Sequence, residues 1–150
     1  MASGLRYGVE MRRAQAADAA ELTRLLAQAG AGVSPVEAAE RLEAMQARPD
    51  CAVLVTTGYG GLSGLVALHW AMVLHQARPV AVVTTLVVDV DERRHGIGRL
   101  LLKAASQAAR AAGCDDLTVA GDGALAIFCE ATGFTRIGPT FTRSLRKRTI

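Results

Sequence analysis

The stretch from Leu86 to Leu102 restricts the fold more than any other part of the sequence. It begins as a β-branched apolar run, passes through a charged turn and continues with a helical repeat of apolar residues. The repeat places apolar residues three or four positions apart on one face of a helix. These residues are Ile97, Leu100, Leu101, Ala104, Ala105, Ala108 and Ala112. The stretch therefore predicts a strand, a turn and an amphipathic helix in direct succession.

The predicted start of this helix is suited to binding an anion. The first amides of a helix have no acceptor within the helix, and they carry the positive end of its dipole. Arg93, Arg94 and Arg99 add positive charge. We expect Gly96 and Gly98 to adopt positive φ and to let a phosphate approach the backbone. The turn therefore predicts a pyrophosphate site.

Two common nucleotide-binding loops do not fit this turn. A dinucleotide fingerprint would need a third glycine where Leu101 stands, and a P-loop would need a lysine followed by serine or threonine. The sequence has neither feature, so the phosphate belongs to another class of ligand.

The pattern Arg93-x-x-Gly96-x-Gly98, directly after a strand, resembles the acyl-CoA loop of the GNAT family of N-acetyltransferases. A second segment, Ala126 to Phe134, reads A-I-F-C-E-A-T-G-F and is similar to a later motif of that family. The resemblance implies an α/β fold with a mixed, mostly antiparallel central sheet of six to seven strands. It also implies about four helices on the faces of the sheet, which would splay between its fourth and fifth strands. We expect a single N-acetyltransferase domain over residues 1–150.

The resemblance further implies acetyl-CoA as the co-substrate and assigns the residues that bind it. The pantetheine arm would pair with the backbone at Val88 and Val90. The Val88 amide would stabilise the charge that develops on the thioester oxygen, an effect worth ~3 kcal/mol. The diphosphate would lie on the turn and the helix start, formed by Arg93, Arg94, His95, Gly96, Ile97, Gly98 and Arg99.

The proton-transfer groups are less standard than the cofactor loop. The family usually places a tyrosine after the phenylalanine of the second motif as the acid, but this chain has Cys129 there. A thiol could deliver the proton, although a buried, inert cysteine is the alternative. Where some relatives carry a glutamate before the loop, the chain has Val82, Val83, Thr84 and Thr85. We therefore take His69 as the candidate base, against a structural histidine.

This choice of His69 depends on the predicted pairing of two strands. Pairing Leu62–Leu74 with Val80–Val90 about their loop places His69 opposite Thr85, ~10 Å from Val88 at the rise of a strand. His75 would lie ~30 Å away. Period-two alternation puts both Trp70 and Met72 on the face of the strand opposite to His69. We expect core positions for both.

The rest of the chain predicts alternating strands and helices. Asp18 with Glu21, and Ser34 with Glu37, form capping-box patterns that start helices ending near Gln28 and Ala47. Further strands and one short helix complete the pattern. The strands are expected at 7–13, 52–57, 117–120, 134–137 and 140–145, and the helix at 124–131, ended by Gly133.

Composition limits the function classes. A net charge of +3 suits a polyanionic cofactor but is too small to indicate nucleic acid. Cys51, Cys114 and Cys129 lack metal-ligand spacing, which predicts no metal site and favours a reducing, cytoplasmic compartment. No segment predicts a signal peptide or membrane span. The acidic cluster Asp89, Asp91 and Glu92 is more typical of a solvated turn than of a ligand set.

Three functions remain open at this stage. The leading one is acetyl transfer from acetyl-CoA to a small amine, supported by a weak likeness to aminoalkylphosphonate and aminoglycoside acetyltransferases in the spacing of His69 and His75. The alternatives are a CoA-binding sensor or interaction module with little or no catalysis, and a protein N-acetyltransferase. A homodimer through residues 134–145 is compatible with the sequence.

Overall fold

The structure is a computed structural model that describes residues 9–58, 60–120, 123–138, 141 and 143–146. It divides into two compact units, Met1–Ala120 and Gly121–Ile150, and each is described here by itself. The first unit contains the sheet and the predicted cofactor turn. The single domain over residues 1–150 stays a prediction.

The sheet of the first unit has five strands in the order in which they occur along the chain. The first four are antiparallel and the fifth is parallel to the fourth. Their bounds are β1 Glu10–Arg13, β2 Cys51–Gly58, β3 Gly61–Ala71, β4 Val80–Val88 and β5 Leu117–Val119. The parallel pair confirms that a helix carries the chain back between β4 and β5.

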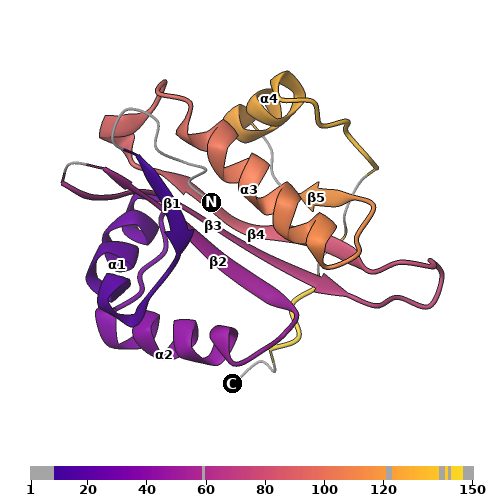
Figure 1. Ribbon diagram of the computed structural model, residues 1–150, viewed down its shortest axis with the longest axis horizontal. Helices are drawn as coiled ribbons and strands as arrows, with labels where there is room; N and C mark the ends of the chain where they lie inside the picture. Colours follow the sequence, from indigo (N-terminus) through magenta and orange to yellow (C-terminus); the bar gives the residue numbers. More distant parts are fainter. Residues whose placement is uncertain (1–8, 59, 121–122, 139–140, 142, 147–150) are drawn as a thin grey trace. The chain divides into compact units, whose positions relative to one another are not determined.

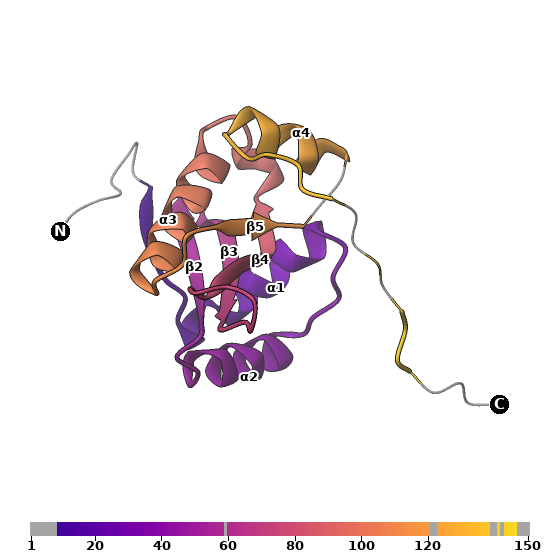
Figure 2. The same ribbon diagram turned by 90° about the vertical axis from the view of Figure 1, so that its right-hand side faces the viewer.

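Helices cover both faces of this sheet (Figure 1, Figure 2). On one face, α1 (Ala19–Gln28) and α2 (Pro35–Gln46) bury Leu22, Leu25 and Leu42 in a cluster with Val53, Val55, Leu65 and Val87. On the other face lies α3 (Ile97–Ala111), whose buried residues include Leu101, Leu102 and Ala105. Alternate residues of a strand point to opposite faces, so β3 supplies both layers.

Gly64 of β3 lets α3 approach the sheet closely. A Cβ atom at this position would lie 2.7 Å from Leu101 Cδ1 and 2.9 Å from Ile97 Cγ2. Both residues are at the start of α3, and Gly64 pairs with Val88 across the ladder. The missing side chain therefore places the N-terminal turn of α3 directly beside the end of β4.

One of the two predicted capping boxes is confirmed and the other is wrong. The Ser34 hydroxyl accepts from the Glu37 N–H, and the Glu37 carboxylate accepts from the Ser34 N–H. Asp18 instead ends the short 3-10 helix η1 (Ala16–Asp18), where it accepts from the Gln15 N–H at 2.7 Å and pairs with Arg12. The guanidinium, which the local pattern cannot reveal, draws this carboxylate away from the cap of α1.

The hairpin of β3 and β4 is shorter than predicted, and its register is different. β3 ends at Ala71 and β4 at Val88, so Met72 lies outside the ladder with 91% of its surface exposed. Its predicted core position is therefore wrong, while Trp70 is half-buried. The ladder reaches Ala71 and Val80 around a loop over 72–79, so His69 lies opposite Val82. The loop predicted at 75–79 was too short, which displaced the counted register, and an irregularity between Ala67 and Leu68 shifts the pairing by only one further residue toward Val88.

The described residues of the second unit contain one helix, α4 (Gly123–Ala131). It ends as predicted at Gly133, whose φ is +96°, and the Phe134 N–H donates to the Cys129 carbonyl at 2.9 Å. The two strands predicted after it are not formed by the described residues of 134–146, and 139, 140 and 142 lie outside the description. Among the described residues the sheet therefore has five strands rather than six or seven, because apolar alternation does not by itself supply a ladder partner.

No helix among the described residues has both the length and the apolar character needed to cross a membrane.

Candidate active site

The backbone of Val88 is directed toward the open edge of β4. The Asp89 N–H donates to the Ser63 carbonyl at 2.9 Å, which makes this the hydrogen-bonded position of the ladder with β3. Hydrogen-bonded and non-bonded pairs alternate along an antiparallel ladder. Val88, one residue earlier, therefore turns its N–H and C=O away from β3, and Leu86 does the same.

The sheet opens beside Leu86 and Val88. β5 pairs with β4 only from Ala81 to Val83, and no other strand of the described residues pairs with this edge. The backbone polar groups of Leu86 and Val88 on this edge thus have no strand partner among the described residues, and a ligand with amide groups could extend the ladder there. This arrangement confirms the splay expected between the fourth and fifth strands.

The turn after β4 reaches α3 in a conformation that only partly matches the prediction. The chain forms a 3-10 helix, η2 (Val90–Glu92), and then Arg94 and Gly96 adopt left-handed φ values of 72° and 77°. Gly98 has no positive φ, because it is already the second residue of α3. The expectation for Gly98 was therefore wrong, and the left-handed Arg94 was missed because its side chain gives no signal for it.

The N-terminus of α3 has the features of an anion site. No side chain caps it, no acidic residue lies in its first turn, and the Leu100 N–H is the first to reach a helical acceptor, the Gly96 carbonyl. The N–H groups of Ile97, Gly98 and Arg99 therefore have no partner within the helix. Arg93, Arg94, His95 and Arg99 are exposed around them. A Cβ at Gly96 would have no atom within 4 Å, so the space over the turn is open.

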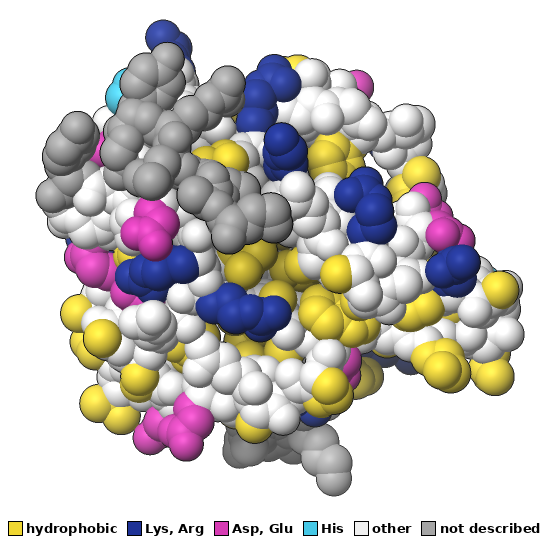
Figure 3. All heavy atoms as spheres, viewed as in Figure 1, with side chains coloured by type: hydrophobic (Ala, Val, Ile, Leu, Met, Phe, Trp, Pro, Cys, Tyr) yellow, Lys and Arg dark blue, Asp and Glu magenta, His cyan; other side chains and the backbone are white. Residues whose placement is uncertain are grey.

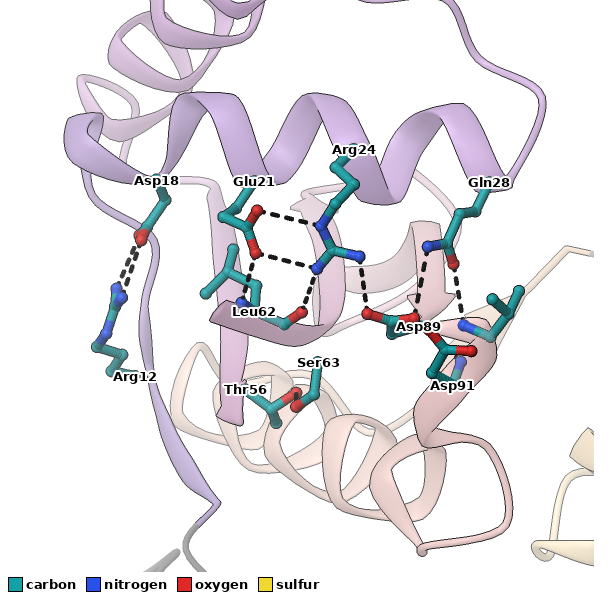
Figure 4. Close-up of polar contacts among 11 residues, drawn as sticks. Arg12, Asp18, Glu21, Arg24, Gln28, Thr56, Leu62, Ser63, Asp89 and Asp91 are labelled. Atoms are coloured by element: carbon teal, nitrogen blue, oxygen red, sulfur yellow. Dashed lines mark hydrogen bonds and ion pairs between the residues drawn. The ribbon is translucent and has the colours of Figure 1, made fainter. Parts of the chain in front are cut away.

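The sequence predicted that Asp89 lies in a solvated acidic turn. The structure shows instead that Asp89 is buried, with 8% of its surface exposed. Its carboxylate accepts from Arg24 Nη1 at 2.7 Å, from the Asp91 N–H at 3.1 Å and from Gln28 Nε2 at 3.4 Å (Figure 4). The backbone N–H of Asp91 and the guanidinium of Arg24 lower the pKa of Asp89, against the opposing effect of its burial. Of the other two acidic residues, Asp91 is exposed and Glu92 is half-buried.

Gln28 also binds the Val90 N–H, a backbone group that was expected to bind the cofactor. Its side-chain oxygen accepts from the Val90 N–H at 3.0 Å (Figure 4). Val90 lies in η2 rather than in β4. The predicted strand-like pairing of pantetheine with the Val90 N–H therefore conflicts with this contact. The Val88 N–H, which is directed away from β3, is not affected by it.

His69 does not lie near Val88. Its partner Val82 is six residues from Val88 along β4, which corresponds to ~20 Å at the rise of a strand. The predicted position opposite Thr85 was wrong, and the geometric reason for choosing His69 as the base is lost. His95, in the turn, is exposed and contacts Glu92 at 3.3 Å.

Cys129 is buried in the second unit, and this burial raises the pKa of its thiol. Its carbonyl accepts from the Phe134 N–H and from the Thr132 hydroxyl, so the residue sits at the C-terminal end of α4. The thiol keeps its proton at neutral pH. Its role as an acid stays a prediction.

A separate hollow lies between the end of α2 and the start of β2, where apolar side chains are visible beside Lys or Arg (Figure 3). Its lining consists of Arg13, Met45, Gln46, Arg48, Cys51, Ala52 and Val53. It lies at the start of β2, whereas the turn between β2 and β3, which leads to Gly64, lies at the end of β2. Among the described residues no group of histidine, cysteine and carboxylate side chains is arranged to hold a metal ion.

Comparison with known proteins agrees with this geometry. The model of the acetyltransferase (GNAT) family matches residues 19–134, which include the splay, the turn and α4. The chain belongs to the GNAT acetyltransferase family. It is therefore an acyltransferase, and the family generally uses acetyl-CoA as donor. No curated protein sequence matches the chain.

Solved structures of GNAT acetyltransferases share the fold. A protein described as an acetyltransferase from Agrobacterium tumefaciens is 25% identical, with a TM-score of 0.81 over 90% of this chain and 99% of that one. Glucosamine-6-phosphate N-acetyltransferase from Arabidopsis thaliana is 16% identical, with a TM-score of 0.82 over 92% and 99%. An aminoglycoside acetyltransferase from a soil metagenomic sample, in complex with sisomicin, is 20% identical, with a TM-score of 0.75 over 92% and 97%.

Proposed function

We propose that this GNAT protein transfers the acetyl group of acetyl-CoA directly to the amine of a small molecule. The observation that carries the proposal is the direction of the Val88 N–H, which points into the splay beside the uncapped start of α3. One site would then hold both the diphosphate and the reacting thioester.

The cofactor would bind in two parts. The diphosphate would accept hydrogen bonds from the N–H groups of residues 97–99 and from the exposed Arg93, Arg94 and Arg99, because both the helix dipole and the guanidinium groups favour an anion there. The pantetheine amides would extend the β4 ladder at Leu86 and Val88, where β5 has diverged.

The chemical step requires a neutral amine and a protonated leaving group. The amine nitrogen attacks the thioester carbonyl and the C–N bond forms. The C–S bond then breaks to release the CoA thiolate, and the nitrogen loses a proton to water to give the neutral amide. The Val88 N–H would stabilise the negative oxygen of the tetrahedral intermediate, an effect worth ~3 kcal/mol or about 100-fold in rate. The Cys129 thiol is the candidate donor of the final proton, since burial keeps it protonated.

A small-molecule acceptor is supported by two of the similar structures, an aminoglycoside acetyltransferase and glucosamine-6-phosphate N-acetyltransferase, both named for small molecules that carry amino groups. The specific observation in favour of a CoA-binding module without catalysis is Cys129, where the resembled motif has a tyrosine. A protein acceptor remains the other alternative to a small molecule.

The test combines binding and turnover. Calorimetry should detect CoA binding, and thiol release from acetyl-CoA should depend on an acceptor from a panel of aminoglycosides, amino sugar phosphates, polyamines and aminophosphonates. CoA binding without turnover on the small amines or on peptides would favour the binding module, and turnover on peptides alone would favour a protein acceptor. No CoA binding at all would overturn the cofactor site itself.

Cys129 can be tested in the same assay with Cys129→Ser and the matched control Cys114→Ser. Both thiols are buried, and burial raises the pKa of both. If Cys129 is the acid, kcat falls only in Cys129→Ser, by roughly 10-fold to 100-fold. Equal rates in the two variants would leave protonation of the thiolate to water.

A further inference from the structure

The residue that follows Val88 is held from two sides. The backbone N–H of Asp89 donates to the Ser63 carbonyl of β3. The buried carboxylate of Asp89 accepts hydrogen bonds from Arg24 and Gln28 of α1. A carboxylate taken out of water is costly unless charged or polar donors surround it, and here three donors do so. The peptide that joins Val88 to Asp89 is thus fixed by both its ladder bond and its side chain.

Arg24 connects this point to the start of β3. Its guanidinium donates to the Leu62 carbonyl at 2.7 Å and to both oxygens of Glu21 at 3.0 and 3.1 Å (Figure 4). Glu21 in turn accepts from the Leu62 N–H at 2.9 Å. Arg24, Glu21, Gln28 and Asp89 form a network, called here the α1 clamp, that binds α1 to the ends of two adjacent strands.

The clamp also binds backbone groups that directly follow the reaction position. Asp89 accepts from the Asp91 N–H, and Gln28 accepts from the Val90 N–H. These contacts turn the chain into η2 immediately after β4. The Val88 N–H belongs to the last peptide of β4, between Val87 and Val88, and the clamp holds the peptide that follows it and the point at which the strand ends.

We propose that Asp89 is a positioning residue for acetyl transfer, which acts through the α1 clamp to hold the Val88 N–H at the thioester oxygen. The inference rests on the proposed function. Asp89 touches neither substrate, and it acts on the transition state through the backbone of Val88. The diphosphate site is separate, because α3 is placed by its packing on Gly64 and not by Asp89.

The test compares Asp89→Asn with Asp18→Asn. Asp18 is a matched control, since its side chain is 10% exposed against 12% for Asp89, and each carboxylate pairs with an arginine at 2.7 Å and accepts a backbone N–H. Unlike Asp89, Asp18 is not adjacent in the chain to a predicted reacting group. Both variants should lose thermal stability to a similar extent.

Only Asp89→Asn should lose kcat, by about 10-fold, because a misdirected oxyanion donor is lost to the transition state. Its CoA dissociation constant should change far less, and Asp18→Asn should keep wild-type kcat. Gln28→Ala, which removes one partner of Asp89 from a half-exposed position, should lower kcat less with little loss of stability. Wild-type turnover with unchanged kcat in Asp89→Asn and Gln28→Ala would overturn the inference and leave the function standing. A wild type without CoA binding or turnover would overturn both.

Discussion

Helices α1 and α3 both reach the end of β4, from opposite faces of the sheet, but they are held there in different ways. α3 rests on Gly64 by close apolar contact of Ile97 and Leu101, and its first amides carry no protein anion. α1 adds to its apolar face an ion-paired clamp on Asp89. The packing contact leaves the positive helix end available for a phosphate, whereas the clamp fixes the direction of a single backbone group.

The largest effect is expected from adding a side chain at Gly64, where α3 packs on β3. Gly64→Ala would place Cβ 2.7–2.9 Å from Leu101, Thr56 and Ile97, so the free energy of unfolding should fall by about 1–3 kcal/mol. CoA binding should weaken as α3 is displaced. Denaturant titration and calorimetry measure the two effects.

The matched control for this variant is Gly58→Ala on the neighbouring strand. A Cβ there would meet its nearest atom, Ser63 Cβ, at an ordinary 3.5 Å. If Gly64→Ala were as stable as Gly58→Ala and bound CoA as tightly as the wild type, close packing would not position α3.

A second variant separates the ends of α3. Gly96 before the helix and Gly113 after it both have left-handed φ, 77° and 93°, and both have open space at Cβ. Gly96→Ala and Gly113→Ala should therefore each cost about 1 kcal/mol of stability. Only Gly96→Ala should also weaken CoA binding, because its Cβ would project over the phosphate turn. Equal CoA affinity in the two variants would contradict a diphosphate site at this turn.

Acid should weaken the ion pairs of the α1 clamp but not the apolar packing of α3 on Gly64. The pKa of Asp89 lies below its usual 3.8 and that of Glu21 below its usual 4.5, because Arg24 and backbone N–H groups stabilise their charged forms. Their contribution is therefore complete above the unfolded pKa values and is lost as the pH falls through the lowered ones. Arg24 is 38% exposed, so about 1 kcal/mol is expected for Asp89.

Unfolding measured from pH 7 down to pH 2 should show this loss. Asp89→Asn should be less sensitive to acid than the wild type, and the residual slope should come from groups such as Asp18. The penalty of Gly64→Ala should be the same at both ends of the range. An Asp89→Asn variant with the full acid sensitivity of the wild type would show that the clamp does not stabilise α1.

The smallest effect is expected at His69. It lies opposite Val82 and not beside either helix contact at Val88, so His69→Ala should leave kcat and its pH profile unchanged. Rates measured from pH 6 to pH 9 on a productive acceptor test this. Loss of the acidic limb, in which the rate rises with pH, would restore His69 as a base despite its distance.

The same contrast explains what the sequence could predict. The α3 turn is local, since Gly96, the arginines and the apolar repeat lie within one continuous stretch, and their chemistry predicted an anion site and the strand–helix order. The clamp joins Arg24 to Asp89 across 65 positions, and no local pattern reports such a pair. Asp89 therefore looked like a solvated turn residue, and Asp18 looked like a helix cap.

Strand register sets a second limit. The pairing of Ala71 with Val80 places His69 opposite Val82, three residues from Thr85, although the two strands of the hairpin were both predicted. The expected strands after α4 show the same limit, because alternation at 134–145 does not specify a partner. Periodicity reveals which face a residue prefers, but register depends on contacts between distant segments.

The most direct measurement follows the backbone amides of labelled protein by NMR during titration with acetyl-CoA. The amide signals of Val88 and of residues 97–99 should shift together at one dissociation constant, while those near the opposite end of β4, at Val80 and Ala81, should change little. Saturating acetyl-CoA that leaves the Val88 amide unshifted would contradict the site at the end of β4.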